Sequence, residues 1–202
     1  MADMSTQTSS LSLPQMIAGR LAGDSAVRNT ALVIGASLLL ALSAQVAIPM
    51  PLSPVPLTLQ PLALLLLGAA LGPGRAAAAA ALYLVEGATG LPVFAQGRGG
   101  MAVLAGPTAG YLFAFPVAAF IAGWVARSRW TRSPLTTIPG MALALATIHL
   151  GGWSWLAGVW GLDARQAFIA GVAPFLVNDA IKVSIAAMLL PAAERIVAKF
   201  QR

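Results

Sequence analysis

The stretch TALVIGASLLLALSAQVAI, residues 30–48, contains 19 consecutive residues without a charged side chain. A helix needs about 20 mainly apolar residues to cross the hydrocarbon core of a membrane. Four prolines follow, at positions 49, 51, 54 and 56. A helix cannot continue through them, because proline lacks the backbone N–H that helical hydrogen bonding requires. We therefore predict a membrane-spanning helix over Thr30–Ile48.

The composition of the whole chain extends this prediction. Of its 202 residues, 58% are hydrophobic and 9% are charged, whereas a soluble domain has roughly 45–50% apolar and roughly 25% charged residues. So few charges cannot cover the surface of a water-soluble protein, and a disordered chain needs the opposite composition. The sequence predicts an all-α integral membrane protein without room for a second, soluble domain.

Apolar runs separated by Pro, Gly and basic turns predict six transmembrane helices. These are Thr30–Ile48, Thr58–Leu71, Ala76–Gly87, Tyr111–Ala126, Ile138–Ala157 and Pro174–Leu190, the last continuing as helix to Ala198. Segments 87–110 and 158–173 are expected to be connecting loops. Residues 1–28 are predicted to be a cytoplasmic lead-in with a short surface helix over Pro14–Leu21. Residues 29–198 are expected to form one transmembrane domain, and residues 199–202 a cytoplasmic tail.

The basic residues predict the orientation of this bundle, because Lys and Arg concentrate in cytoplasmic loops. If 58–71 and 76–87 are two separate spans, both termini lie inside and nine of the 12 basic residues are cytoplasmic. Those nine are Arg20, Arg28, Arg75, Arg127, Arg129, Arg132, Arg195, Lys199 and Arg202. We therefore expect a multi-pass protein of the cytoplasmic (inner) membrane. Its two short spans either tilt little or are sheltered by protein on either side.

The residue counts exclude several classes of function. The chain has no cysteine and one histidine, so disulfides, thiolate metal sites and di-histidine metal motifs cannot form. The net charge of +6 is explained by orientation signals, and no nucleic-acid motif accompanies it. We expect no metal, no cofactor, no nucleic-acid partner and no enzymatic activity. The lipid bilayer is the surrounding medium.

Asp179 and Lys182 are the strongest candidates for a functional site. They are three residues apart, so they share one face of the last predicted helix. Ionisable residues within spans are costly and most often line a site or a pathway. The alternative is a structural pair that neutralises itself. Asn178 precedes the pair but points roughly 100° away, so it is a secondary candidate.

Further candidates lie at the outer ends of the predicted spans. Glu86, with Tyr83 one turn before it, ends the third span and either reaches headgroup water or lines the same cavity. Arg98 lies in the glycine-rich segment 87–110, where it is either a solvated charge or a partner for a carboxylate. Thr58 and Gln60 begin the second span. Helix capping is an alternative role for Thr58, but it does not explain Gln60.

Three further features have structural interpretations beside functional ones. His149, in the middle of the fifth span, is expected to hydrogen-bond to another helix. Small residues on the first span, Ala31 with Gly35 and Ser37 with Ala41, allow close helix approach. They serve either internal packing or the docking of another membrane protein.

Three strings in the middle of the chain resemble a known family. They are VPLTLQPLALLLLGAALGPGR (55–75), YLVEGATGLPVFAQGRGG (83–100) and LAGPTAGYLFAF (104–115). Together with the Asp179-x-x-Lys182 pair, they resemble the BioY family, the biotin-specific substrate-binding S components of energy-coupling factor (ECF) transporters. The resemblance extends from Ala31 to Leu190, with Asn178 and His149 as departures from the residues expected there.

The resemblance implies a six-helix S component with an outward-facing biotin site. It also implies a partner ECF module of one membrane coupling protein and two ATP-binding subunits. The chain itself has no phosphate-binding Walker motif, in agreement with ATP hydrolysis by partner subunits. In this family the small-residue face of the first span contacts the coupling protein, and Ala31 with Gly35 occupy the matching positions here.

For biotin we expect Asp179 to accept a ureido N–H and Lys182 to donate to the ureido carbonyl. Phe94 and Tyr111 are expected to cover the rings, and Arg98 to face the carboxylate. The reverse orientation, with Lys182 on the carboxylate, is the alternative. The candidate binding residues are Asp179, Lys182, Glu86, Thr58, Gln60, Tyr83, Phe94, Arg98, Tyr111 and Asn178. The competing functions are a self-sufficient carrier or channel and, with less support, an intramembrane enzyme.

Overall fold

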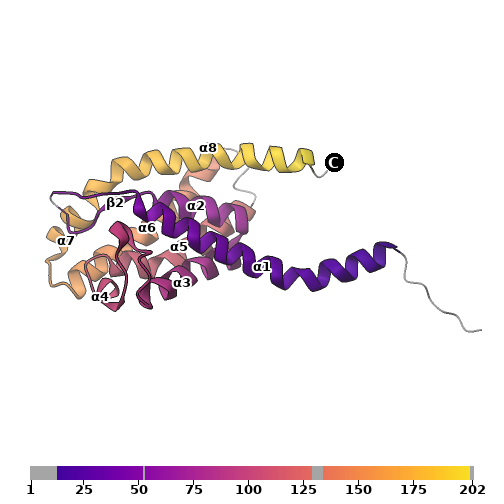
Figure 1. Cartoon of the computed structure of the whole chain (residues 1–202). Helices are drawn as coiled ribbons and strands as arrows, with labels where there is room; N and C mark the ends of the chain where they lie inside the picture. Colours follow the sequence, from indigo (N-terminus) through magenta and orange to yellow (C-terminus); the bar gives the residue numbers. More distant parts are fainter. Residues whose placement is uncertain (1–12, 52, 129–133, 201–202) are drawn as a thin grey trace, which may run out of the picture.

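The computed structural model describes residues 13–51, 53–128 and 134–200, and it is almost entirely helical (Figure 1). Its main helices are α1 (Leu13–Gln45), α2 (Gln60–Leu71), α3 (Pro73–Ala88), α5 (Ala109–Arg127), α6 (Pro134–Gly158), α7 (Ala164–Gly171) and α8 (Leu176–Phe200). Short elements complete the described chain: β1 (Ala47–Ile48), β2 (Leu57–Thr58), η1 (Ala95–Gly97), α4 (Met101–Leu104) and η3 (Ala173–Phe175). Each of the six predicted spans contains a helix, which confirms the all-α membrane fold.

The bundle has two different ends. The short elements β1, β2, α4 and α7 gather at one end, on the left in Figure 1, which we call the loop end. The N-terminal part of α1 and the C-terminal part of α8 extend toward the other end. The connections between the main helices, which carry the candidates Thr58, Phe94 and Arg98, are therefore gathered at one end of the molecule.

Among the described residues, three helical segments are long and apolar enough to cross a membrane. They are Ala26–Gln45, Ala109–Arg127 and Ala164–Leu189. Their outward-facing side chains are large and apolar, as Leu38 on α1, Val117 on α5 and Met188 on α8 illustrate, each more than half exposed. An exposed apolar surface that extends over several helices is typical of contact with lipid.

Helix α5 lies at the centre of the bundle, where it packs against α2, α3 and α6. Of its 19 residues, 12 are buried, so its side chains form a large part of the described core. The crossing with α6 depends on two glycines, because a Cβ at Gly110 or Gly151 would overlap the backbone of the other helix. Small residues therefore set how closely these two helices approach.

Helix α2 has only 12 residues and is about 18 Å long at ~1.5 Å per residue, which is less than the ~30 Å of a hydrocarbon core. It packs against α1, α3, α5 and α8, and only Ala70 along its length is exposed. The predicted shelter for this short span is confirmed. The helix that is too short to cross a membrane alone is thus surrounded by other helices of the bundle.

Several predicted boundaries were wrong at the N-terminal side of the chain. The surface helix over Pro14–Leu21 and the first span are one continuous helix, α1, which ends at Gln45 rather than Ile48. The two flanks of the proline-rich segment pair as an antiparallel hairpin, Ala47 with Thr58 and Ile48 with Leu57. The second span consequently begins at Gln60 instead of Thr58.

Other boundaries differ because proline and aspartate can start helices. Pro73 begins α3 directly after Gly72, since a proline in the first turn loses no helical hydrogen bond. The predicted loop 158–173 contains α7, which Asp163 caps by accepting a 2.8 Å hydrogen bond from the Gln166 N–H. The predicted loop 87–110 likewise contains η1 and α4. Pro174 lies in η3, so the last helix begins two residues later, at Leu176.

Candidate functional site

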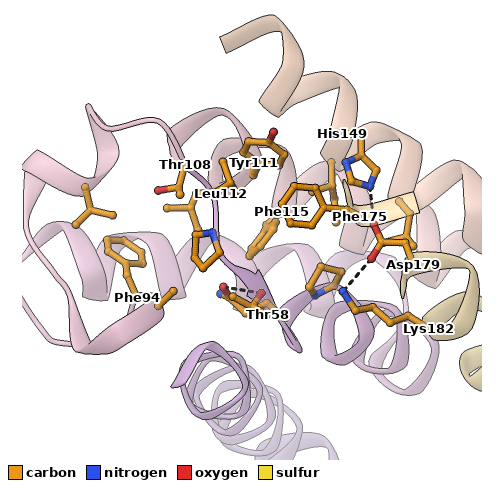
Figure 2. Close-up of a pocket in the computed structure, with 18 of the residues that line it drawn as sticks. Thr58, Phe94, Thr108, Tyr111, Leu112, Phe115, His149, Phe175, Asp179 and Lys182 are labelled. Atoms are coloured by element: carbon orange, nitrogen blue, oxygen red, sulfur yellow. Dashed lines mark hydrogen bonds and ion pairs between the residues drawn. The ribbon is translucent and has the colours of Figure 1, made fainter. Parts of the chain in front are cut away.

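A cavity opens between five segments of the chain at the loop end (Figure 2). The hairpin segment and the start of α2 form one wall, and the segment between α3 and α5 forms another. Helices α5, α6 and α8 close the remainder. The lining residues are Val55, Pro56, Thr58, Gln60, Pro61, Phe94, Ala95, Arg98, Val103, Thr108, Tyr111, Leu112, Phe115, Leu145, Ile148, His149, Phe175, Asp179 and Lys182. A largely apolar hollow with a few convergent polar groups is the usual form of a small-molecule site.

The polar groups concentrate around Asp179, in the first turn of α8. Lys182 Nζ donates to Asp179 Oδ1 at 2.8 Å, and His149 Nε2 lies 2.6 Å from Asp179 Oδ2. Because an ionised carboxylate only accepts hydrogen bonds, Nε2 is the donor. Asp179 and Lys182 are 6% and 4% exposed, and both line the cavity. The pair is thus buried and lines the cavity, and Figure 2 shows His149 and Lys182 directed at Asp179.

This cluster keeps hydrogen-bonding capacity for a ligand. A carboxylate has about four lone-pair positions, and the two bonds within the cluster use one on each oxygen of Asp179. The Lys182 ammonium has three N–H groups, of which one is directed to Asp179. Acceptor and donor positions therefore remain side by side on the cavity wall, where both a donor and an acceptor of one ligand can bind.

His149 hydrogen-bonds from α6 to α8, which confirms the predicted interhelical role. The sequence analysis did not include it among the binding candidates, although it lines the cavity. Its ring packs edge-on against Tyr111 and lies 6.2 Å from the ring of Phe175. A solitary histidine inside a span, opposite an ionisable pair on another span, is a signal that would have identified it.

Aromatic rings make up the apolar part of the cavity. Tyr111 and Phe115 lie one turn apart on α5, and Phe175 lies in η3, one turn before Asp179. Tyr111 Oη donates to the Gly171 carbonyl at 2.7 Å, which fixes the ring. Figure 2 shows these rings between the Asp179 cluster on one side and Phe94 with Thr108 on the other. Phe115 and Phe175 were absent from the predicted candidates.

Thr58 and Gln60 reach the cavity from the start of α2. The capping role considered for Thr58 was wrong: among the described residues the N-cap of α2 is Leu59, and no side chain caps it. The side chains of Thr58 and Gln60 contact each other at 3.5 Å. Gln60 also donates from Nε2 to Tyr83 Oη at 2.7 Å. Tyr83 is fully buried and does not line the described cavity. Its hydroxyl holds the Gln60 amide in place from behind.

The segment between α3 and α5 contributes Phe94 and Arg98. The Phe94 ring is buried over Gly87, where a Cβ would overlap it. The Phe94 N–H donates to the Arg98 carbonyl at 2.9 Å, which closes a tight turn around η1. The Arg98 side chain is anchored from Nε to the Ala95 carbonyl at 3.2 Å. Arg98 is thus held in place while it lines the cavity.

Besides Tyr83, two more predicted candidates lie apart from the described cavity lining. Glu86 accepts a 2.9 Å hydrogen bond at Oε1 from Ser37 Oγ on α1, so its carboxylate connects α1 to α3. Asn178, next to Asp179, is partly buried on a different face of α8. Of the ten predicted residues, the described cavity brings together Asp179, Lys182, Thr58, Gln60, Phe94, Arg98 and Tyr111.

The two small-residue pairs on α1 have different environments. Ser37 and Ala41 are buried and pack inside the bundle. Ala31 and Gly35 are exposed, and a Cβ at Gly35 would meet open space within the described structure. The described residues contain no group of three or more His, Cys, Asp or Glu side chains able to hold a metal ion.

Comparison with known proteins identifies the family. The BioY family model matches residues 8–199. The chain is 40% identical over 151 residues to a probable biotin transporter BioY of Pyrococcus horikoshii, covering 75% of this chain and 86% of the relative. It is 34% identical over 161 residues to the biotin transporter BioY of Rhizobium etli, covering 76% and 86%.

A solved structure has the same fold. It is the crystal structure of the S-component for biotin from an ECF-type ABC transporter, with a TM-score of 0.77 and 21% sequence identity. The match covers 85% of this chain and 93% of the other.

Proposed function

The chain belongs to the BioY family, and we propose that it is a multi-pass membrane protein that binds biotin as the S component of an ECF-type importer. The observation that carries this proposal is the cluster of Asp179, Lys182 and His149 on the wall of the cavity. Its free donor and acceptor positions match the ureido group of biotin, which offers two N–H donors and one carbonyl acceptor. The surrounding rings match the bicyclic part of the vitamin.

The ligand enters with its ureido end toward α8 in this proposal. Asp179 accepts one ureido N–H, Lys182 donates to the ureido carbonyl, and Tyr111 covers the rings. The carboxylate lies toward Arg98, in the segment on the opposite side of the cavity. Each charge-assisted hydrogen bond in such a sheltered site contributes about 1.5–3 kcal/mol.

Binding of labelled biotin by the purified chain, without ATP or partners, tests the proposal directly. We expect saturable binding in the nanomolar range, with one biotin per chain recovered unchanged. Absence of saturable binding at micromolar biotin would overturn the assignment. Recovery of a chemically altered ligand would favour an intramembrane enzyme instead.

The orientation of biotin is tested with a biotin amide, which lacks the negative charge of the tail. In the wild-type chain we expect the amide to bind more weakly than biotin. In Arg98→Met the difference between biotin and its amide disappears, because the partner of the carboxylate is gone. If Lys182→Met removes the difference and Arg98→Met preserves it, the ligand lies in the reverse orientation.

The partner in this proposal is an ECF module of one membrane coupling protein and two ATP-binding subunits, docked on the exposed face at Ala31 and Gly35. Both termini and this face then belong to the cytoplasmic side of the inner membrane. The variant Gly35→Leu should bind biotin normally but lose biotin uptake with the module, and Val117→Leu, exposed on α5, is the matched control. Equal uptake by both variants would refute this docking face.

A self-sufficient carrier is the second candidate, and vesicles containing only this chain distinguish it. We expect bound biotin but no accumulation inside the vesicles until the module and ATP are added. Accumulation by the chain alone would establish the carrier.

A further inference from the structure

We propose that Gln45, the last residue of α1, is a positioning residue that holds the segment Val93–Arg98 in place beside the cavity. This inference rests on the proposed biotin site, since Phe94, Ala95 and Arg98 from this segment line it. Gln45 itself lies outside the described cavity lining. Its effect on the ligand is therefore exerted through the backbone that carries those residues.

The Gln45 carboxamide bonds to the segment through both of its polar atoms. Gln45 Oε1 accepts from the Gly97 N–H at 3.0 Å. Gln45 Nε2 donates to the Phe94 carbonyl at 3.3 Å, with the Val93 carbonyl at 3.4 Å, and to Ala41 of its own helix at 2.9 Å. One side chain thus satisfies a backbone donor and a backbone acceptor of the same turn.

The turn that Gln45 binds contains a residue in an unfavourable backbone conformation. Gln96 has φ 63°, which is the left-handed conformation, and Gly97 follows with φ 67°. Glycine adopts this conformation readily, but glutamine rarely does. Gln96 is also exposed, so its side chain is not held by burial. The bonds from Gln45 to both sides of Gln96 compensate for this conformation and keep the turn formed.

Keeping the turn formed fixes two groups at the site. The Phe94 N–H bonds to the Arg98 carbonyl across the turn, and the Arg98 guanidinium is anchored to Ala95 within it. If the turn opens, the Phe94 ring no longer packs over Gly87. The Arg98 side chain then loses its hydrogen bond to the Ala95 carbonyl. The bound ligand then loses the wall formed by this segment, and it leaves the cavity faster.

The first test measures biotin association and dissociation rates for Gln45→Leu. The matched control is Ser43→Ala, which removes a hydroxyl bonded only within α1, to the Leu40 carbonyl. We expect Gln45→Leu to accelerate dissociation about tenfold, the size expected for losing one or two net hydrogen bonds, with association changed less than about twofold. Gln45→Glu retains the acceptor for Gly97 but loses the amide donor, and should accelerate dissociation about threefold.

A second measurement separates positioning from general damage. Trypsin cleavage after Arg98 reports opening of the turn, and cleavage after the exposed Arg165 on α7 is the internal reference. We expect Gln45→Leu to increase cleavage at Arg98 alone. Adding Gln96→Asn should restore part of both effects, because asparagine tolerates the left-handed conformation better than glutamine. If Gln45→Leu does not fold, Gln45→Glu and the double variant provide the same comparison.

The outcomes distinguish this inference from the proposed function. If the wild type binds biotin and Gln45→Leu matches Ser43→Ala in dissociation and in cleavage at Arg98, the positioning role is wrong and the biotin site stands. If the wild type binds no biotin, the proposed function fails. Cleavage at Arg98 then still decides whether Gln45 holds the turn.

Discussion

Asp179 and Glu86 are two carboxylates on predicted spans, and they have different surroundings. Asp179 is buried, bonded to Lys182 and His149, and borders the cavity. Glu86 is only partly buried, and Ser37 bonds to it between α1 and α3. Both carboxylate oxygens of Asp179 are hydrogen-bonded, next to the cavity. In Glu86 only Oε1 is bonded, and Oε2 is buried without a hydrogen-bond partner among the described residues. The comparison separates a carboxylate that lines the cavity from one that connects helices.

The substitution Asp179→Asn should produce the largest effect on biotin binding. It removes the charge that Lys182 and His149 surround, and it leaves Lys182 buried without a counter-charge, which is strongly unfavourable. We expect biotin affinity to fall by about 100-fold or more, equivalent to about 2.7 kcal/mol, measured by equilibrium binding of labelled biotin. Asn178→Ala, on a different face of the same helix, is the control and should stay within about twofold. Equal losses in both variants would mean that the first turn of α8 has been disturbed as a whole.

His149→Phe should have an intermediate effect. It keeps a ring next to Tyr111 and Phe175 but removes the donor to Asp179, so that the carboxylate is less firmly oriented. We expect about tenfold weaker binding, the cost of one hydrogen bond to a charged group, and His149→Gln should recover part of it. Unchanged affinity with lowered thermal stability would show that His149 only connects α6 to α8.

Glu86→Gln should have the smallest effect on binding and so sharpens the contrast. The amide retains an acceptor for Ser37 Oγ, and we expect biotin affinity to change less than about twofold. Glu86→Leu removes the partner of Ser37 and should lower the stability of the folded chain by about 1 kcal/mol, measured by thermal unfolding in detergent. A tenfold loss of biotin affinity in Glu86→Gln would place Glu86 with the binding residues. The distinction between Glu86 and Asp179 would then be wrong.

The difference between these carboxylates also indicates how far sequence can predict this site. Spacing alone places Asp179 and Lys182 on one face of a helix, and the family resemblance marks them for the ligand. Spacing does not decide whether the Glu86 side chain faces the cavity or a neighbouring helix. It depends on how α3 is rotated in the bundle, and the buried stripe that fixes this rotation consists of Ala76, Ala79, Ala80, Tyr83 and Gly87.

Contacts between distant segments were beyond prediction from one sequence. Gln45 meets Gly97 across 52 positions of the chain, and no local pattern links the two residues. His149 and Asp179 are 30 positions apart, although each was singled out separately. The long apolar runs determined the helices well, whereas prolines were misread at Pro73 and around the β1–β2 hairpin. A proline that ends one helix and a proline that begins the next look alike in sequence.

The unbroken course of α1 has a consequence for energetics. Gly35, which faces outward, and Gln45, which grips the Val93–Arg98 turn, are ten residues apart on one helix, about 15 Å at ~1.5 Å per residue. A partner that tilts or rotates α1 at Gly35 therefore also changes the geometry of the hydrogen bonds from Gln45 to Phe94 and Gly97. If biotin binds as proposed, thermodynamic reciprocity requires that such a partner changes the affinity for biotin by the same factor by which biotin changes the affinity for the partner.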